Sequence, residues 1–136
     1  MIQQKEISLP AFSRGFHLIT RYIEQELPSL PEQGILNILL KHTSAGLTLN
    51  ENADPTVRDD FESFISRMVP ENQSYFIHTL EGSDDMPAHI KSSIFGANLS
   101  IPITRGRLNL GTWQGIYLCE FRNHGGRRRI VLTIYS

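Results

Sequence analysis

The sequence has little of what marks several protein classes. Only one of its 136 residues is a cysteine, Cys119, which excludes a scaffold stapled by disulfides within the chain. No apolar run approaches the roughly 18 residues that a membrane-spanning helix needs. Residues 1–6 lack the basic, apolar and small-residue order of a secretion signal. We therefore expect a cytoplasmic protein without a membrane partner.

Neither sign of charge is in excess. Thirteen Lys and Arg against fourteen Asp and Glu give a formal net charge of -1 at pH 7. Binding of nucleic acid by bulk electrostatics needs a strongly basic face, so we expect no nucleic-acid partner. Hydrophobic residues make up 40% of the chain, which is enough for a packed core and excludes a disordered chain. At this length we expect a single domain over residues 1–136.

Apolar spacing predicts three helices. Residues 16–27 place apolar side chains at steps of three and four, as an amphipathic helix does. Asp54-Pro55 is a typical helix start, and the apolar stripe that follows ends before Pro70. The segment 83–85, followed by a proline, predicts a short third helix that ends at about Ile94.

Strands account for most of the remaining chain. Predicted strands are residues 7–9, 35–40, 47–49, 74–80, 99–103, 107–110, 115–122 and 128–135. The nearly continuous apolar run 35–40 is typical of a strand covered on both faces. The last two strands flank the Gly-rich segment 123–126, which favours a hairpin connection. Helices in the first two thirds and strands at the end indicate an α+β fold rather than alternating βαβ units.

A first candidate site is the turn His42–Gly46, just after an apolar strand. Its histidine can donate or accept a hydrogen bond or bind a metal ion, and the hydroxyls of Thr43 and Ser44 can hold an anion. The alternative is a histidine that only satisfies carbonyls of a Ser/Thr turn. The Gly-x-Ser-x-Gly spacing of a serine-hydrolase elbow is absent.

A second candidate site is the pair Asp85 and His89. Residues four apart share a helix face, so the pair offers one oxygen and one nitrogen ligand, or a base held by a carboxylate. The alternative is an aspartate that caps the helix beside a solvated histidine. His17 and His78 have no charged partner nearby in sequence, and we predict structural roles for both.

A third candidate site follows the strand that contains Glu120. Alternation puts Glu120 and Arg122 on one strand face and Tyr117 and Cys119 on the other. His124 and residues 127–129, all arginine, come next and suggest a phosphate-binding cluster. The alternative is an edge strand protected from aggregation by its charges. We predict that Cys119 is a core residue and not a nucleophile.

The only tryptophan, Trp113, stands between glycines in a turn before this strand. It can line a site for an aromatic ring or close the end of the sheet.

Four motifs occur in order along nearly the whole chain. They are HTSAGLTLNEN (42–52), DDMPAHIK (84–91), GTWQGIYL (111–118) and HGG (124–126). Together they resemble the secondary thiamine-phosphate synthase family, the YjbQ-like proteins. The resemblance implies an antiparallel β-sandwich-like core with about three helices, a homotrimer, and a weak transferase activity in thiamine biosynthesis. That activity joins hydroxymethylpyrimidine diphosphate to thiazole phosphate and releases diphosphate; it is considered a side reaction.

The resemblance also implies a set of site residues. The matching positions are His42, Thr43, Ser44, Asn50, Glu51, Asp85, His89, Trp113, Gln114, Glu120, His124 and Arg128. Among them, His42, Asp85, His89 and Glu120 are the catalytic candidates, and the others are candidates for binding substrate.

Three hypotheses about the site follow. In the first, an arginine clamp of Arg122, Arg127 and Arg128, or Mg²⁺, neutralises the diphosphate. In the second, His42, Asp85 and His89 hold a divalent metal ion such as zinc in an enzyme of unknown substrate, with Glu120 or His124 as further ligands. In the third, a trimer binds a small phosphorylated metabolite without turnover. All three require that the four motifs converge in one hollow.

Overall fold

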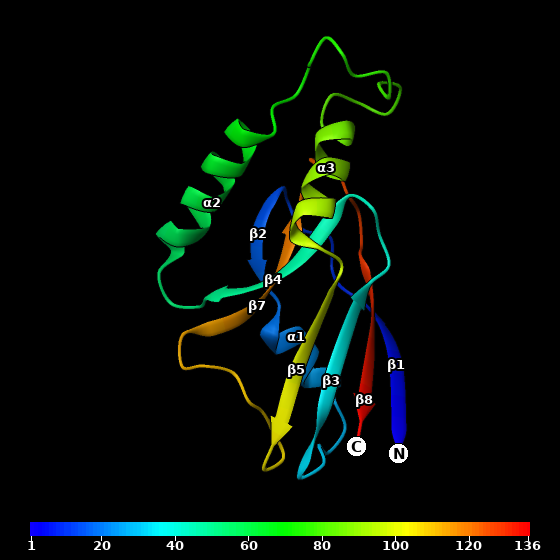
Figure 1. Cartoon of the computed structure of the whole chain (residues 1–136), viewed down its shortest axis with the longest axis vertical. Coiled ribbons are helices and arrows are strands. Elements are labelled where there is room, and N and C mark those ends of the chain that lie inside the picture. The colour runs from blue at the N-terminus through cyan, green and yellow to red at the C-terminus, as the bar shows by residue number, and fades with distance from the viewer.

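The computed structural model describes residues 1–136. Two antiparallel sheets form its framework (Figure 1). The larger sheet contains, in spatial order, β1 (Ile2–Ser8), β8 (Arg129–Tyr135), β3 (Gln33–Leu40), β5 (Asn98–Thr104) and β6 (Arg107–Leu108). The smaller sheet contains β2 (Gly15–Leu18), β7 (Gln114–Glu120) and β4 (Ala45–Glu51). The helices are α1 (Thr20–Glu26), α2 (Pro55–Met68) and α3 (Asp85–Phe95). The predicted α+β class with a sandwich-like core and three helices is confirmed.

The main core lies between the two sheets. Alternate residues of β3, Leu36, Ile38 and Leu40, face Ile116 and Leu118 of β7 within one buried cluster. Burial of each such side chain stabilises the fold by about 1.5–3 kcal/mol. This layer therefore accounts for the apolar side chains at alternate positions of both strands.

A second apolar layer lies on the opposite face of β7, beneath α2 and α3. Tyr117, Cys119 and Phe121 pack there against Ile65 of α2 and Ala88 of α3. The predicted division of this strand into two faces is thus confirmed, and both faces are buried. Burial raises the pKa of the Cys119 thiol, as expected for a core cysteine.

Helix α2 begins as its sequence predicts. The carboxylate of Asp54 accepts a hydrogen bond from the backbone N–H of Thr56 at 2.9 Å, and Pro55 is the first helical residue. The helix ends before Pro70, where the N–H of Val69 bonds the carbonyl of Ile65.

Two predictions about the early strands are wrong. Residues 16–18 belong to β2, so the first helix is confined to Thr20–Glu26. The run 35–40 is covered on one face only, because Ile35 and Leu39 of β3 are 48% and 44% exposed on the outer face of the larger sheet. The continuous apolar run therefore combines one face of β3 that lies in the core with one apolar face that is exposed.

Two predictions about the later segments are also wrong. Residues 74–80 form no strand: they lie in the long connection between α2 and α3, where no other strand pairs with them. Segment 123–126 is not a hairpin, because β7 belongs to the smaller sheet and β8 to the larger one. The chain crosses between sheets at this point, which brings the polar residues around 120–128 together.

The ends of the chain lie side by side, as Figure 1 shows, because β1 pairs with β8 over its whole length. None of the three helices is long and apolar enough to cross a membrane.

Candidate functional site

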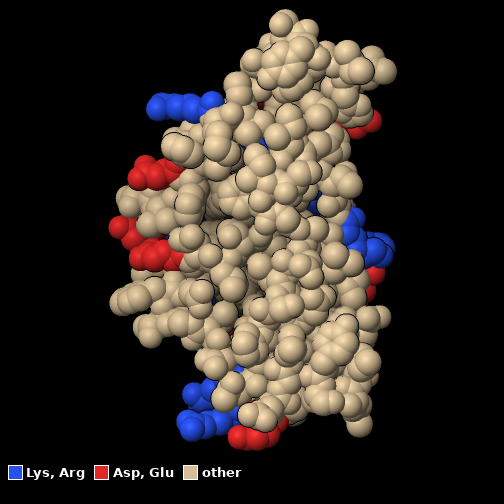
Figure 2. Space-filling model, in the orientation of Figure 1, with Lys and Arg blue, Asp and Glu red and all other residues tan.

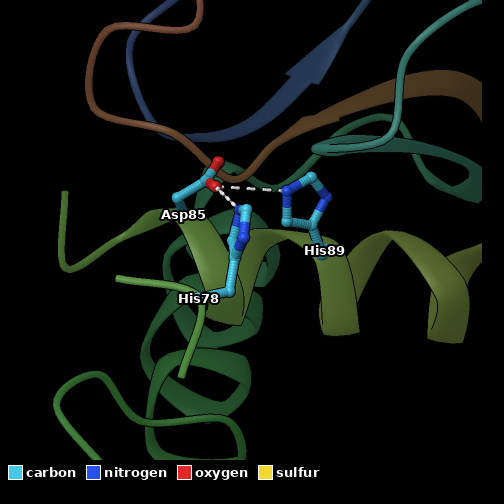
Figure 3. Close-up of side chains that lie close together, drawn as sticks. All are labelled: His78, Asp85 and His89. Atoms are coloured by element: carbon cyan, nitrogen blue, oxygen red, sulfur yellow. Dashed lines mark hydrogen bonds and ion pairs between the residues drawn. The ribbon is translucent and has the colours of Figure 1, made fainter. Parts of the chain in front are cut away.

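Three side chains that can bind a metal ion meet at the N-terminal end of α3 (Figure 3). The Nε2 atom of His78 lies 2.8 Å from Oδ2 of Asp85, and the Nε2 atom of His89 lies 3.2 Å from the same oxygen. The three ligand atoms lie within 4.8 Å of one another. We call this group the open triad. Two imidazoles and a carboxylate with room for further ligands suit zinc and related divalent ions.

Helix geometry and one arginine position the carboxylate of the open triad. Asp85 lies in the first turn of α3 and is 1% exposed, and His89 follows one turn later on the same face. The other carboxylate oxygen, Oδ1, accepts a hydrogen bond from Nη1 of Arg122 at 2.7 Å. Arg122 also donates from Nε to Asp84 and from Nη2 to the carbonyl of Glu81, so each of its three guanidinium nitrogens makes a hydrogen bond.

The hydrogen bonds of His89 make its contact with Asp85 unfavourable unless a positive charge is present. Its Nδ1 lies 2.8 Å from the carbonyl oxygen of Thr43, which can only accept, so Nδ1 carries a proton. In the neutral ring Nε2 is then an acceptor that faces the Asp85 carboxylate, and two acceptors repel each other. A second ring proton or a metal ion resolves this conflict. Ligand histidines typically bind a metal with one nitrogen while the other donates to a carbonyl.

A second polar group, which we call the closed pair, joins Glu120 to Arg128. The Glu120 carboxylate is fully buried and accepts from Nε and Nη2 of Arg128 at 2.8 and 2.6 Å. It also accepts from the backbone N–H of Arg122, while Nη2 of Arg128 donates to the carbonyl of Ser44. A β-carbon at Gly125 would overlap with the carboxylate, so the crossing loop closes directly over it. These groups satisfy one another and leave no room for a ligand.

His42 lies near the closed pair and takes no part in the open triad. Its Nε2 accepts a hydrogen bond from the backbone N–H of Arg129 at 2.8 Å, which requires the neutral ring. Burial, together with the positive charge of Arg128, lowers the pKa of His42 below its ordinary value. The hydrogen bond therefore joins the end of β3 to the start of β8.

The remaining arginine and loop candidates have separate partners. Arg127 donates to the hydroxyl and the carbonyl of Ser8, so it does not adjoin the open triad. His124 is exposed in the crossing loop, beside a hollow that it lines with Phe12 and Ser13. The three arginines of the predicted clamp thus point to three different sets of groups.

The GTWQG motif and the end of the HTSAGLTLNEN motif lie at the other end of the smaller sheet. Glu51 pairs with Gln114 and Asn50 with Gly115, six and five residues along β7 from Glu120. At roughly 3.3 Å per residue, about 20 Å separate Gln114 from Glu120. Trp113 is 64% exposed there and does not close the sheet. The expected convergence of four motifs in one hollow is therefore not formed within the chain.

His78 is the residue that sequence reasoning missed. Its position in a segment that we predicted to be a strand, without a charged neighbour, suggested a structural role. Only the path of the α2–α3 connection brings it back onto Asp85, seven residues later. The sequence holds no periodic signal for such a return.

Comparison with known proteins agrees with this fold. The sequence profile of the family described as "UPF0047 protein YjbQ-like" matches residues 5–136. The chain is 55% identical to the UPF0047 protein YjbQ of Escherichia coli O157:H7 over 136 residues, 98% of each chain. A conserved hypothetical protein of Thermus thermophilus, 35% identical, superposes with a TM-score of 0.83 over 97% of this chain and 99% of its own. None of these names states a reaction.

Proposed function

This chain belongs to the UPF0047 YjbQ-like family, and we propose that it is a metal-dependent enzyme acting on a small phosphorylated metabolite. The proposal rests on the open triad, in which Oδ2 of Asp85 faces the Nε2 atoms of His78 and His89. The other ring nitrogen of His89, Nδ1, donates to the carbonyl of Thr43. A divalent cation satisfies all these atoms at once. Zinc is the ion that this set of nitrogen and oxygen ligands favours.

The ligands are placed so that a substrate can reach the ion. Asp85 is buried, whereas the side chains of His78 and His89 are 49% and 30% exposed. The open triad therefore faces solvent on the side of the histidines. Three protein ligands leave at least one coordination position for another molecule, as catalytic zinc sites do.

The finer activity implied by the resemblance is the formation of thiamine phosphate from hydroxymethylpyrimidine diphosphate and thiazole phosphate. Departure of diphosphate requires positive charge near its oxygens. Arg128 is buried against Glu120, and Arg122 is engaged with Asp84 and Asp85, so these arginines are not free to supply that charge. A divalent ion held by the open triad would supply it. This need for positive charge favours the metal-dependent form of the reaction over the arginine clamp.

We also propose that the chain forms the homotrimer implied by the resemblance. The outer face of the larger sheet supports self-association, because cross-strand neighbours on it form an apolar row. The row consists of Ile2, Tyr135, Ile35 and Pro102. Ile2, Tyr135 and Ile35 are 65%, 47% and 48% exposed. Light scattering of the purified protein tests the trimer, and a monomeric mass would reject it.

Metal analysis tests the proposed ion site. Protein purified without added ions, then dialysed against zinc, is expected to hold about one equivalent per chain. Asp85→Asn and His89→Ala are expected to lose it, while His17→Ala, a histidine substitution outside the open triad, retains it. Zinc content that is far below one equivalent, or that both variants retain, would reject the site.

An activity assay tests the finer reaction. Wild-type protein is incubated with both substrates, and thiamine phosphate is measured by chromatography before and after chelation. Product that disappears with chelation and in His89→Ala supports a metal-dependent transferase. If zinc binds and thiamine phosphate does not form, the reaction is a different one. Tight binding of either substrate without turnover, read from a shift in melting temperature, would instead indicate a non-enzymatic binding module.

A further inference from the structure

The connection between α2 and α3, residues 69–84, is the longest segment of the chain without a helix or strand. It projects beyond the helices at one end of the molecule (Figure 1). The view in Figure 2 shows that charged side chains lie mostly along the margins of this face, and the projecting end is largely uncharged. This segment delivers His78 to the open triad, so its own stability bears on ion binding.

The base of the connection is firmly closed. One oxygen of the Glu71 carboxylate accepts from the hydroxyl of Ser83 at 2.6 Å, and the other accepts from Nη1 of Arg14 at 2.8 Å. Two residues with a left-handed backbone, Asn72 (φ 59°) and Gly82 (φ 110°), stand just inside this closure. The chain therefore leaves and returns at one point, as in an Ω-loop.

The tip of the loop, residues 74–80, is held far more weakly. Tyr75, Ile77 and Leu80 are 75%, 97% and 99% exposed, so the tip gains little from apolar burial. Its only hydrogen bond to a residue outside the loop joins His78 to Asp85 at 2.8 Å. The His78 ring also stands edge-on to the ring of His89, with centroids 5.4 Å apart. One part-buried hydrogen bond contributes too little to offset the conformational entropy that is lost when such a segment is ordered.

We propose that the metal ion of the open triad is the latch that holds the tip on the body of the protein. This inference rests on the proposed function. Asp85 and His89 belong to α3 and form a fixed half of the site, whereas His78 belongs to the tip and is the movable half. Coordination by all three joins the halves, and loss of the ion leaves the tip free.

The position of the tip also shapes a hollow beside the open triad. A space of about 140 Å³ lies between the loop and α3, lined by His78, Phe76 and Thr79 of the tip and by Met86 of the helix. Because the tip supplies one wall, the hollow exists only while the tip is held.

Limited proteolysis with chymotrypsin tests the latch, because Tyr75, Phe76 and Leu80 offer cleavage sites in the tip. Wild-type protein is digested with zinc or with a chelator, the fragments are identified by mass, and bound zinc is measured on the same samples. We expect zinc to slow cleavage within the tip at least tenfold. Hydrogen exchange of residues 74–80 in the uncut protein is expected to slow in parallel.

Two variants separate the latch from ion binding itself. His78→Ala removes a half-exposed side chain and no core contact, so we expect it to fold, to bind zinc at least tenfold more weakly, and to be cut rapidly even at saturating zinc. His17→Ala is expected to be protected like the wild type. Zinc that binds the wild type without slowing cleavage or exchange in the tip, or that protects His78→Ala equally, would overturn the latch and leave the ion site standing. Absence of bound zinc would overturn the proposed function and the latch with it.

Discussion

The open triad and the closed pair are two polar groups of opposite design at the same end of the smaller sheet. In the closed pair, the Arg128 guanidinium donates two short hydrogen bonds to the buried Glu120 carboxylate. The backbone N–H of Arg122 donates to the same carboxylate, and the carbonyl of Ser44 accepts from Arg128. In the open triad, two imidazole nitrogens face one carboxylate oxygen, and both rings are partly exposed.

The difference shows which polar cluster a protein can use. A buried pair that is fully hydrogen-bonded fixes the backbone around it and is costly to disturb. In a half-exposed group where two acceptors meet, either a further proton on the histidine or a bound metal ion relieves the repulsion. The closed pair holds the crossing between the sheets, whereas the open triad is the group on which the proposed function depends.

Breaking the closed pair is expected to have the largest effect. Glu120→Gln removes the charge that balances the buried Arg128, so the free energy of unfolding is expected to fall by about 3–5 kcal/mol. Urea unfolding measures this, with Glu24→Gln on the exposed face of α1 as the control. A loss as small as that of the control would show that the pair is not structural. Zinc content per folded chain is expected to stay unchanged.

The loop over the closed pair gives a second, smaller effect. In Gly125→Ala the new methyl group would overlap with the Glu120 carboxylate, so either this carboxylate, which Arg128 holds, or the loop must shift. We expect a loss of about 1–3 kcal/mol in the free energy of unfolding. In the Glu120→Ala background the carboxylate is absent, so Gly125→Ala is expected to lower the free energy of unfolding by less than it does in the wild type. Equal penalties in both backgrounds would contradict this account.

Arg122 lies between the two groups, because its backbone N–H donates to Glu120 and its guanidinium donates to Asp85. It holds Asp85 through Nη1, and Arg122→Gln is therefore expected to weaken zinc binding about 10- to 100-fold by loosening the ligand. Titration calorimetry measures the affinity. Arg127→Gln, whose arginine bonds only Ser8, is the matched control and is expected to bind zinc normally. Identical affinities in the two variants would show that Arg122 does not position the carboxylate.

The smallest expected effect is a dependence of stability on pH at His42. Its pKa is lowered from 6.5 in the folded protein, chiefly by burial, so the unfolded chain takes up a proton at higher pH than the folded one. The free energy of unfolding therefore falls as pH drops below about 6.5. Urea unfolding at pH 7.5 and pH 5.5 is expected to show a smaller decrease for His42→Gln than for the wild type. An equal decrease would exclude His42 as the cause.

Local patterns predicted much of the fold and two of the three residues of the open triad. The capped start of α2, the two faces of β7 and the pair Asp85–His89 each follow from residues close together in sequence. Sheet membership did not follow, because a Gly-rich connection suits a hairpin and a crossing between sheets equally well. Residues 74–80 were predicted as a strand because their composition resembles one, yet no neighbouring strand is available to pair with them.

The amino-acid order alone specifies the periodicities of the helices and strands, the cap of α2 and the shared helix face of Asp85 and His89, because each depends on neighbours within a few positions. The meeting of His78 with these two residues, and of Glu120 with Arg128, arises only in the folded chain. Folding also separates Trp113 from both groups. Contacts of this kind depend on where long connections return, and that is set by packing of the two sheets and not by any local preference of the chain.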